Sequence, residues 1–521
     1  MRSRRNTGGV TSKPWIHPSF VVGVMILLMA VPGCDTHSDA RPDDPFAEAR
    51  TEIEKLMESE GISAYQVAVA RGESIIYTEA FGVADVERGI PTRTDTMFDV
   101  ASISKPFVST ALMMLVEQGL IALDTPVNEF LAGPKLVAYR GDASDATIAR
   151  LLFHTTGLPY GYYTAGEDVP VERRRTPRDL IELSGVLATE PGTRHEYTNI
   201  GYDLFGEILR ETAGENINEF IAREILGPLG LTRTRFLRSS PPADQIAAQN
   251  TPEGVVPIVF DAEGYSRLYS TAEDLVRFGM FHLGTLRDAP ELLSQSSRDE
   301  LWQAQEPEVQ DTMRRMGWYV QHDFGFDTVQ HGGGGPGMHN WLYMIPSESV
   351  VIAIMSNLRY SSSKTDPVLT ALIRGAISGS ETPEFQPDEG RGWIWPPELN
   401  AVDYAGTWTG HARGPKGSCR VDFRIGSDGL AKLQIEGDPC NEDGWISPST
   451  DETTGYGSLL WRFDACIPFI APLAPHDEVI VTIWPEGEKL IGSASAANEK
   501  VFGQGEAYVL PQFLELTRVT E

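Results

Sequence analysis

Ser102 and Lys105 are the first residues of this sequence whose types and spacing suit covalent chemistry. They stand three positions apart in Ser102-Ile103-Ser104-Lys105, where an irregular segment meets a stretch that is apolar on nearly every side. On a helix this spacing is about one turn, which places the serine hydroxyl and the lysine amine on one face. A serine at a helix start lies where backbone N–H groups are unpaired and the helix dipole favours negative charge. This placement suits a nucleophile; the alternative is that Ser102 only caps a helix and Lys105 is a solvated side chain.

Two further segments carry residues that fit the same chemistry. Tyr197-Thr198-Asn199 precedes a predicted helix, and His331-Gly332-Gly333-Gly334-Gly335 precedes a strand-like run from Trp341 to Ile345. With Ser102, Tyr197 and His331 in this order, the chain resembles the serine β-lactamase and penicillin-binding protein superfamily, in particular its class C-like branch with Ser-x-x-Lys, Tyr-x-Asn and Lys/His-x-Gly motifs. The resemblance covers roughly residues 46–377 and includes three supporting stretches: Leu151–Pro159, Ser270–Leu275, and Pro336-Gly337 followed by Asn340.

The resemblance implies a role for each matching residue. Ser102 would attack an acyl carbon and become acylated, and Lys105 and Tyr197 are the candidates for its base. Two groups this close should titrate as a coupled pair. Asn199 would orient Lys105 and the substrate amide. Three further aromatic residues are candidates either for the lining of the substrate cleft or for exposed loop positions: Tyr160, Tyr162 and Tyr163.

The glycine-rich segment supplies the opposite side of the implied cleft. His331 stands where many relatives have Lys, and Gly332 and Gly333 belong to the same substrate-binding motif. The resemblance implies that the backbone N–H groups of Ser102 and Gly334 hold the oxyanion. A His with a pKa near ~6.5 is only partly charged at neutral pH, and Gly332 lacks the hydroxyl of Thr or Ser, so carboxylate capture should be weak. The alternative is a flexible turn between strands; a phosphate-binding loop is less favoured, because no Lys-Ser/Thr or GxGxxG helix start follows.

The activity that the resemblance implies is hydrolysis of an ester or an amide through an acyl-enzyme, as in esterases, D-aminopeptidases or D,D-peptidases. The alternative is a penicillin- or peptidoglycan-binding sensor that is acylated and then deacylates slowly. The expected partner is a small-molecule or peptidoglycan-derived acyl substrate, with no metal and no organic cofactor. The histidines show no HExxH-like spacing, and Cys419, Cys440 and Cys466 match no zinc pattern. In an oxidising compartment these three cysteines allow one disulfide with one thiol left over.

The elements that must position these residues are helices flanked by strands. Helical spacing of apolar residues predicts four helices, over 46–61, 105–118, 200–213 and 272–283. Short apolar runs predict a hairpin from 65–70 and 75–80 around Arg71-Gly72-Glu73, and a strand over 349–355. Strands at both ends with helices between them indicate an α+β body over residues 46–377, with the antiparallel sheet and helical region of a β-lactamase-like catalytic domain.

A domain boundary is predicted near residue 380. Residues 378–400 contain four prolines and several acidic and glycine residues without a sustained period, which is typical of a linker. Beyond it the hydrophobic period changes to two, as in Val421, Phe423 and Ile425, and short alternating runs recur to the end of the chain. Residues 401–521 are therefore predicted to form a small antiparallel barrel or sandwich, similar to the lipocalin-like appendages of some relatives.

The first 33 residues are predicted to be an export signal rather than part of the fold. They contain four basic residues and no acidic one, and their apolar run from Phe20 to Val31 is too short to span a bilayer. Val31-Pro32-Gly33-Cys34 resembles the lipobox of bacterial lipoproteins, which implies a lipid anchor on Cys34 and a tether over residues 34–45. The expected location is therefore extracytoplasmic, on a bacterial membrane, held through acyl chains alone.

Composition argues against nucleic acid as a partner. The 521 residues carry a net charge of −30, whose summed field repels phosphate backbones. With 41% hydrophobic and 22% charged residues, the chain has the composition of a globular protein rather than of a disordered or multi-span membrane protein.

Overall fold

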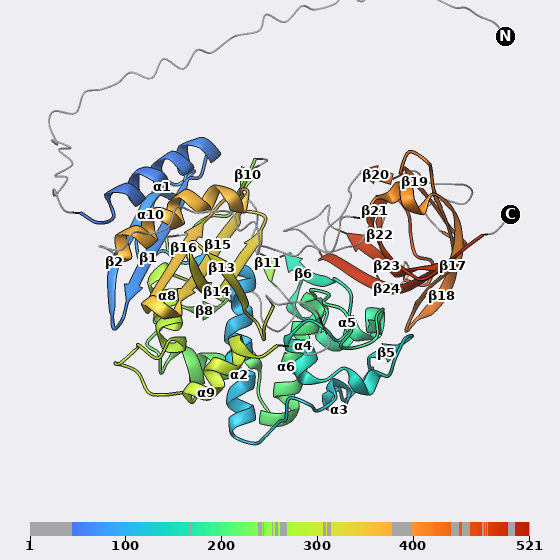
Figure 1. Ribbon diagram of the computed structural model, residues 1–521, viewed down its shortest axis with the longest axis horizontal. Helices are drawn as coiled ribbons and strands as arrows, with labels where there is room; N and C mark the ends of the chain where they lie inside the picture. Colours follow the sequence, from blue (N-terminus) through green and yellow to red (C-terminus); the bar gives the residue numbers. More distant parts are fainter. Residues whose placement is uncertain are drawn as a thin grey trace, which may run out of the picture. The chain divides into compact units, whose positions relative to one another are not determined.

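The computed structural model (Figure 1) describes residues 44–166, 168–237, 242, 244–252, 254–255, 259–260, 268–305, 309, 314–377, 399–438, 448–450, 459–470, 474, 476, 478–498 and 506–519. Five predicted features lie wholly or largely outside these residues: the export signal over 1–33, Cys34, the tether, the linker over 378–400 and Cys440. Residues 45–521 belong to one compact unit.

Seven antiparallel strands of the described residues form a sheet in the order β13-β14-β15-β16-β1-β2-β3. β1 and β2 form the predicted hairpin, with Tyr65 opposite Phe81 and Arg71 opposite Ser74. Gly72 makes their turn with a φ of +59°, a conformation that glycine adopts without a steric penalty. β1 also pairs with β16, which joins the two ends of the predicted catalytic domain. The strands are β1 (Ala64–Arg71), β2 (Ser74–Asp85), β3 (Ile90–Pro91), β13 (Tyr319–Asp323), β14 (Phe326–Gly335), β15 (Met338–Ile345) and β16 (Val350–Ser356).

Helices cover both faces of this sheet (Figure 1). The alternating residues Val67 and Val69 of β1 pack with α1 (Ala47–Glu60) and α10 (Asp366–Ala376) in one apolar cluster. Ala68 and Ala70 point to the other face, where α8 (Ala272–His282) contacts β1 and β16. Both faces of the central strands are therefore buried, which explains why β16 is apolar from Val350 to Met355 instead of alternating.

The helical region surrounds α2 (Ser104–Glu117), which is buried on nearly every side, as its sequence predicts. Phe107 of α2 stacks on Phe278 of α8 with ring centroids 3.7 Å apart. All four predicted helices are confirmed within about a residue at each end, the third as α6 (Asn199–Ala213). The remaining elements before residue 378 are β4 (Phe98–Asp99), η1 (Ala101–Ile103), α3 (Val127–Phe130), β5 (Val137–Ala138), η2 (Ala143–Asp145), α4 (Ile148–Leu152), β6 (Tyr162–Gly166), η3 (Val171–Arg173), α5 (Pro177–Ser184), β7 (Val186–Leu187), α7 (Ile217–Ile221), η4 (Ala222–Leu226), β8 (Arg235–Phe236), β9 (Asn250–Thr251), β10 (Gly254–Val255), β11 (Val259–Phe260), β12 (Leu268–Ser270), α9 (Gln295–Gln303), η5 (Pro346–Glu348) and η6 (Ser362–Thr365).

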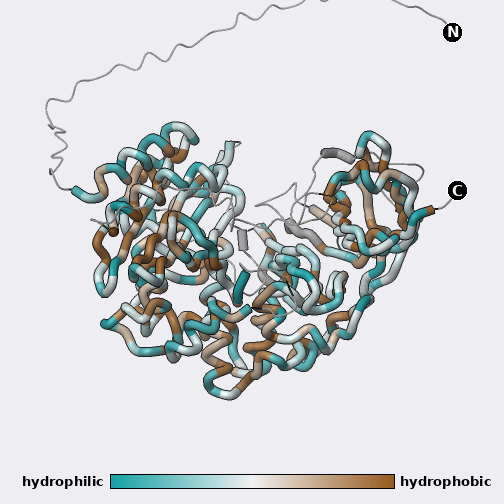
Figure 2. The backbone as a smooth tube through the Cα atoms, viewed as in Figure 1, coloured by the Kyte–Doolittle hydropathy of each residue, from teal (hydrophilic) through white to brown (hydrophobic). Residues whose placement is uncertain are grey.

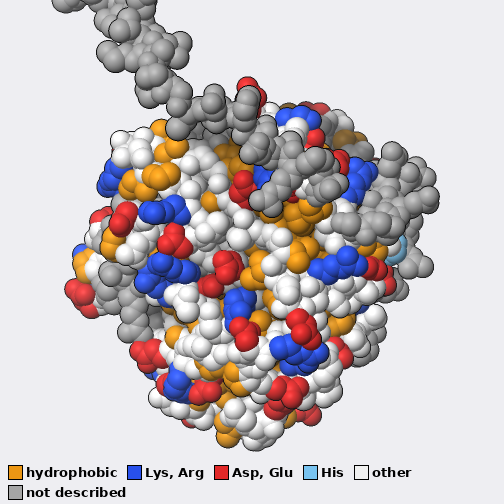
Figure 3. Space-filling view, turned by 90° about the vertical axis from the view of Figure 1, so that its left-hand side faces the viewer, with side chains coloured by type: hydrophobic (Ala, Val, Ile, Leu, Met, Phe, Trp, Pro, Cys, Tyr) orange, Lys and Arg blue, Asp and Glu red, His pale blue; other side chains and the backbone are white. Residues whose placement is uncertain are grey.

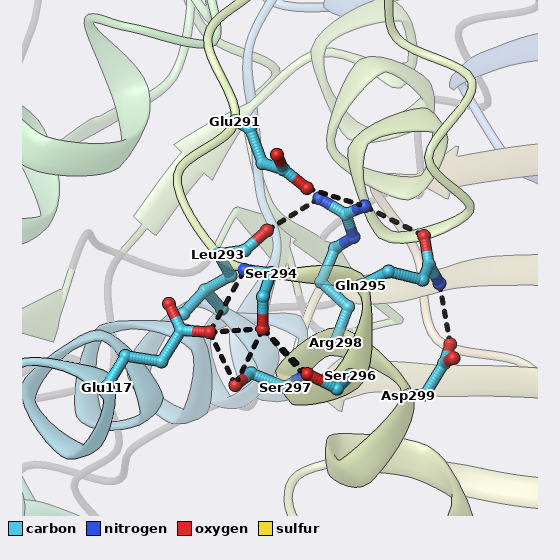
Figure 4. Close-up of polar contacts among 9 residues, drawn as sticks. All are labelled: Glu117, Glu291, Leu293, Ser294, Gln295, Ser296, Ser297, Arg298 and Asp299. Atoms are coloured by element: carbon cyan, nitrogen blue, oxygen red, sulfur yellow. Dashed lines mark hydrogen bonds and ion pairs between the residues drawn. The ribbon is translucent and has the colours of Figure 1, made fainter.

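Glu117 ties the C-terminal end of α2 to the N-terminus of α9 (Figure 4). Its Oε1 accepts hydrogen bonds from the backbone N–H of Ser294 at 3.0 Å, from the Ser297 hydroxyl at 2.6 Å and from the Ser294 hydroxyl. Burial raises the pKa of the Glu117 carboxyl, but the hydrogen bonds from Ser294 and Ser297 outweigh it and leave this pKa below its ordinary value. The helix that carries Lys105 is thus anchored at the end remote from Lys105.

The predicted alternation beyond residue 400 produces a second antiparallel sheet, in the order β19-β18-β17-β24-β23-β22-β21-β20. Its end strands β19 and β20 contact each other, so the sheet is nearly closed. Val421, Phe423 and Ile425 of β18 are buried, whereas Arg420 and Arg424 are exposed, and hydrophobic and hydrophilic stretches follow each other along these strands in Figure 2. The elements are η7 (Ala401–Tyr404), β17 (Gly406–Gly414), β18 (Gly417–Ile425), β19 (Ala431–Ile435), β20 (Pro448–Thr450), β21 (Leu459–Phe463), β22 (Glu478–Glu486), β23 (Lys489–Asn498) and β24 (Glu506–Arg518).

The described cysteines agree with the expected single disulfide. Cys466 is disulfide-bonded, and Cys419 is a buried free thiol. Burial raises the pKa of the Cys419 thiol to about 12, which makes it an inert core residue rather than a reactive one.

Acidic and basic side chains are interspersed on the face shown in Figure 3. Among the ion pairs of the described residues are Arg50–Glu79 at 2.6 Å, Lys364–Glu60 at 2.6 Å and Arg374–Glu48 at 2.9 Å. Across the described part of the chain, no helix has both the length and the apolar character that crossing a bilayer would need.

Candidate active site

Ser102 lies in η1, the single 3-10 turn that leads from β4 into α2. The residue before it, Ala101, has a φ of +47°, which is strained for a residue with a side chain. Asp99 supports this turn, since its Oδ1 accepts a hydrogen bond from Ala101 N at 2.9 Å. Asn340 of β15 in turn donates to the Asp99 carbonyl at 2.8 Å. The local backbone that presents the Ser102 hydroxyl is therefore held by the sheet.

Lys105 lies one turn further along and contacts the serine directly. Its Nζ is 3.2 Å from Ser102 Oγ and 2.8 Å from Asn199 Oδ1. The side chain is fully buried, and Nζ also lies over the rings of Tyr197 and Tyr202, at 4.8 and 5.4 Å from their centroids. Hydrogen-bond acceptors and π faces together replace the water that a buried amine loses.

Tyr197 approaches Ser102 from the loop before α6. Its phenol donates a hydrogen bond of 2.8 Å to Ser102 Oγ. Burial raises the pKa of Tyr197 well above its usual value, and the neighbouring Tyr319 raises it further. The next residue, Thr198, caps α6 by accepting from Gly201 N, which sets the start of the helix and with it the position of Asn199.

His154 is a supporting residue whose place near the nucleophile was not predicted. The structure places its buried ring against Tyr197, with the ring centroids 4.5 Å apart. Its Nδ1 accepts a hydrogen bond from Thr198 N at 3.1 Å. Burial, and next the charge of Lys105, hold the pKa of His154 well below its usual range, so the ring is neutral. The Leu151–Pro159 stretch of the resemblance was the signal that could have identified it.

The glycine run lies in strand β14, and it is not a flexible turn between strands. The reason is close packing: a Cβ on Gly333 would lie 2.0 Å from the Val100 carbonyl oxygen, and one on Gly332 would lie 2.9 Å from the Trp341 ring. At Gly334 a Cβ would meet nothing within 4 Å, so this residue faces open space. Small residues are thus needed where the strand passes η1 and the indole.

His331 is neutral at neutral pH, whereas the sequence predicted a partly charged side chain. The side chain is 3% exposed, and its Nδ1 donates to the Gly332 carbonyl at 2.7 Å. Burial, and next the charge of Lys105, lower the pKa of His331 to about 3. Position 331 therefore offers no cation to a substrate carboxylate at neutral pH.

A cavity of about 990 Å³ opens beside Ser102, large enough for a small-molecule substrate. Its walls are aromatic and polar side chains of β13, β14, β15 and the segment over 359–366. Among its lining residues are Ser102, Tyr197, Tyr319, Asp323, His331, Gly332, Gly333, Gly334, Trp341, Tyr343, Arg359, Tyr360 and Asp366. Tyr160, Tyr162 and Tyr163 are not among the residues that line it; Tyr160 is exposed, and the other two lie in β6.

The structure therefore brings together most of the residues singled out in the sequence. Ser102 contacts Lys105 and Tyr197, and Lys105 contacts Asn199. His331 and Gly332 to Gly334 line the same cavity as Ser102, and Cys34 lies outside the described residues. Within the described ranges, no group of three or more His, Cys, Asp or Glu side chains is arranged to hold a metal ion.

A family model described as Beta-lactamase matches residues 49–374. The chain is similar to Protein flp of Staphylococcus aureus strain N315, with 23% identity over 323 residues, which cover 60% of this chain and 64% of that protein. It is also similar to Penicillin-binding protein 4 of Amycolatopsis lactamdurans, with 28% identity over 352 residues, which cover 63% of this chain and 88% of that protein. The match thus covers less than two thirds of the length of Protein flp.

Among solved structures, the fold resembles that of the octameric penicillin-binding protein homologue from Pyrococcus abyssi. The TM-score is 0.53 at 19% identity, and the match covers 90% of this chain and 99% of that one. At this identity the likeness concerns the fold alone. Because it covers 90% of this chain, it extends beyond the residues of the family match.

Proposed function

This chain belongs to the beta-lactamase family, and on that premise we propose that it is a serine hydrolase that cleaves an ester or an amide through an acyl-enzyme on Ser102. The observation that carries the proposal is the pair of contacts at Ser102 Oγ, 2.8 Å to the Tyr197 phenol and 3.2 Å to Lys105 Nζ. Two groups able to exchange protons thus touch one hydroxyl at the edge of a cavity.

The proposed reaction has two steps with the same proton carrier. In acylation, Ser102 Oγ attacks the carbonyl carbon, its proton passes to the Lys105–Tyr197 pair, and the pair protonates the leaving alcohol or amine as the acyl bond to it breaks. In deacylation, water attacks the acyl carbon and the pair takes the water proton. The pair returns this proton to Ser102 Oγ as the bond between Oγ and the acyl carbon breaks and the carboxylic acid leaves. We assign the negative oxygen of both intermediates to the backbone N–H groups of Ser102 and Gly334.

The surroundings of the nucleophile favour an uncharged group at the position next to His331. His331 is neutral, and the Trp341 ring occupies the space where a side chain at position 332 would stand. His331 offers no charge and Gly332 offers no hydroxyl that would hold a carboxylate. We therefore place esters and amides without a carboxylate beside the scissile bond, as cleaved by esterases or D-aminopeptidases, ahead of β-lactams and of the carboxylate-bearing peptides that D,D-peptidases cleave.

The second candidate is a sensor that is acylated by penicillin or peptidoglycan fragments and deacylates slowly. It is favoured by the 28% identity to Penicillin-binding protein 4. Intact-mass spectrometry separates the two functions. A sensor remains modified for hours after mixing with a β-lactam, whereas a hydrolase returns to its original mass while it turns over p-nitrophenyl esters.

The catalytic assignment is tested with Ser102→Ala and the matched control Ser104→Ala. Ser104 is a neighbouring buried serine whose hydroxyl donates to the Ala101 carbonyl at 2.7 Å. With p-nitrophenyl butyrate, Ser102→Ala should lower kcat/KM by at least about 10³-fold, because no other group replaces the nucleophile. Ser104→Ala should keep most of the activity. The reverse order would make Ser104 the nucleophile.

Export and lipid anchoring are part of the proposal, on the strength of the basic and apolar start of the chain and the lipobox-like Val31-Pro32-Gly33-Cys34. Expression of the full chain in a bacterium with labelled fatty acid should label the wild-type protein and not Cys34→Ala. We also propose that the nearly closed C-terminal sheet is a lipocalin-like domain, which is supported by its alternating burial and by the contact of its end strands.

A further inference from the structure

The C-terminal sheet shares a strand pairing with the part of the chain that holds the candidate active site. β24 is thirteen residues long, and its two portions pair with different partners along the same edge. Phe513 to Arg518 pair with β17, whereas Glu506 to Val509 pair with β6, with Ala507 opposite Thr164. β6 is thereby joined to the sheet formed by residues 406–518.

β6 in turn is connected to the helix that carries Asn199. Gly161, the residue directly before β6, accepts hydrogen bonds from the backbone N–H groups of Asn199 and Ile200, both at 3.1 Å. These belong to the first turn of α6, whose N–H groups have no partner within the helix. The side chain of Asn199 then accepts from Lys105 Nζ at 2.8 Å. Strand pairing, the covalent step from β6 to Gly161 and these hydrogen bonds therefore connect β24 to Lys105.

A second contact reaches the loop before Tyr197. The guanidinium carbon of Arg194 lies 4.4 Å from the ring centroid of Trp484 in β22. Trp484 is 7% exposed and belongs to an apolar cluster drawn from both parts of the chain: Val186, Ala188, Trp484, Ile491 and Phe513. Arg194 also forms an ion pair with Glu196, the residue before Tyr197.

Polar contacts reinforce the same interface. Gln512 Nε2 donates to the Leu183 carbonyl at 3.0 Å, and the Tyr139 hydroxyl donates to the Gly414 carbonyl at 3.3 Å. Arg140 forms an ion pair with Glu486 at 2.8 Å. An interface that combines strand pairing, buried apolar area and directional hydrogen bonds is expected to be rigid.

We infer that the C-terminal sheet positions the Tyr197–Asn199 loop for catalysis, with Trp484 as a positioning residue that acts through Arg194. This inference rests on the proposed function of Ser102, because it assigns a role in the same reaction. A displacement of about 1 Å in groups that must meet a reacting atom can lower a rate by about 10²-fold, so modest loosening of the loop is sufficient. Trp484 is not among the residues that line the cavity, so substrate affinity should change little.

The structure offers a matched control for this tryptophan. Trp408 of β17 is likewise buried in the C-terminal part and likewise lies beside an arginine, Arg518, at 5.6 Å from its ring centroid. Arg518 belongs to β24 of the same part, so this pair does not cross to the candidate active site. Trp484→Leu and Trp408→Leu therefore remove similar packing, but only the first releases the Tyr197 loop.

The kinetic test uses the full chain and p-nitrophenyl butyrate. Trp484→Leu should lower kcat at least about 10-fold with KM within about threefold, whereas Trp484→Phe, which keeps a ring for Arg194, should recover most of the loss. Trp408→Leu should leave kcat within about threefold of wild type. An unchanged kcat in Trp484→Leu, or an equal loss in Trp408→Leu, would overturn the inference.

A second pair of variants covers the case in which Trp484→Leu fails to fold. Arg194→Gln removes the cation from the Trp484 ring, and Glu196→Gln removes the ion pair of Arg194 but keeps the ring contact. Arg194→Gln should lower kcat more than Glu196→Gln does; equal effects of the two would contradict a role for the ring contact.

Hydrogen exchange separates this inference from the proposed function. In wild-type protein the amides of residues 194–200 should be protected, and Trp484→Leu should increase their exchange without changing that of α2. Unchanged exchange of this loop in Trp484→Leu rejects the positioning role, whatever the substrate. Failure of the wild-type protein to hydrolyse any member of a panel of esters and D-amino-acid amides rejects the proposed function and leaves the exchange result standing on its own.

Discussion

The Tyr197 phenol lies 2.8 Å from the Ser102 hydroxyl oxygen, although 95 residues separate the two in the chain. Lys105 is the second donor to that oxygen, at 3.2 Å. A serine oxygen that accepts two hydrogen bonds cannot pass its own proton to either donor until one of them has lost a proton. The Lys105–Tyr197 pair should therefore control the pH dependence of the reaction.

Replacing Tyr197 by Phe should remove half of this proton-carrying pair. We expect kcat/KM for p-nitrophenyl butyrate to fall by about 10² to 10⁴-fold, the usual contribution of a positioned acid or base. Tyr160→Phe is the control, since Tyr160 is an exposed tyrosine that does not line the cavity. Equal rates for Tyr197→Phe and Tyr160→Phe would exclude Tyr197 from the proton transfer.

The same pair predicts a rate that increases with pH. Burial keeps the pKa of Tyr197 well above its usual value, so the deprotonated phenol is scarce at neutral pH and increases on the alkaline side. In a pH profile of kcat/KM, wild-type activity should rise above pH ~7, and Tyr197→Phe should flatten this rise. A profile that is identical in both proteins would assign the titration to another group.

Replacing His331 by Lys should change substrate preference. The ordinary pKa of lysine is ~10.4 against ~6.5 for histidine, so in the same surroundings a lysine carries more charge and would add a charge-assisted hydrogen bond to a carboxylate, worth roughly tenfold in relative kcat/KM. The comparison is p-nitrophenyl hemisuccinate against p-nitrophenyl butyrate, which differ in the terminal carboxylate. His331→Gln, which stays neutral as His331 does, should leave that ratio unchanged. An unaltered ratio in His331→Lys would mean that position 331 does not face the substrate.

Two adjacent glycines should differ sharply in their tolerance of a methyl group. Gly333→Ala would place a Cβ 2.0 Å from the Val100 carbonyl oxygen, whereas Gly334→Ala would place one in open space. We expect Gly333→Ala to lower the free energy of unfolding by about 2 kcal/mol or more, and Gly334→Ala by less than about 0.5 kcal/mol. Thermal unfolding of both variants measures the difference. Equal stability would mean that β14 does not pack against η1 as closely as described.

His282 should make stability depend on pH. It is fully buried, with Nε2 3.1 Å from Thr110 Oγ1, and burial lowers its pKa to about 3. Between pH 3 and the unfolded pKa near ~6.5, His282 is protonated in the unfolded chain and neutral in the folded protein. The contribution of the neutral ring to the free energy of unfolding is therefore full above pH ~6.5. Below that pH it falls by about 1.4 kcal/mol per pH unit.

Urea unfolding of His282→Gln at pH 7 and pH 5 measures this contribution. The variant has no titratable group at this position, so the difference in free energy of unfolding between wild type and variant should shrink by about 2 kcal/mol from pH 7 to pH 5. If this difference in free energy of unfolding is the same at both pH values, His282 takes up its proton in the folded protein as well.

Glu117 should stabilise the contact between α2 and α9 only when it is ionised. Its pKa is lowered, so its contribution is present above the unfolded pKa and is lost as the pH falls through the folded value. Because the residue is exposed, Glu117→Gln should cost only about 0.5 to 1 kcal/mol at pH 7, and this cost should shrink as the pH is lowered through the folded pKa. The control is Glu300→Gln, a substitution of an exposed residue of α9, which should lower the free energy of unfolding at pH 7 by less than Glu117→Gln does. Equal costs for the two variants would remove the special role of Glu117.

Local patterns were sufficient to predict much of this molecule. The one-turn spacing of Ser102 and Lys105, the helical periodicity that ends at Gly61 and the alternation in Val421, Phe423 and Ile425 act over a few residues, and each element formed accordingly. The family, inferred from the order of three short motifs, is confirmed by the match over residues 49–374. Such features are determined by sequence because backbone geometry repeats over one turn or two residues.

Other properties depend on atoms that are remote in the chain, and only the tertiary structure decided them. The neutrality of His331 results from burial beside Lys105, and the glycine at 333 is required by a carbonyl of residue 100. The contact of Trp484 with Arg194 joins residues 290 positions apart, and no local pattern marks either of them. Burial, electrostatic environment and close approach depend on which residues are neighbours in space. Local sequence patterns do not reveal these neighbours, because the fold brings them together from distant parts of the chain.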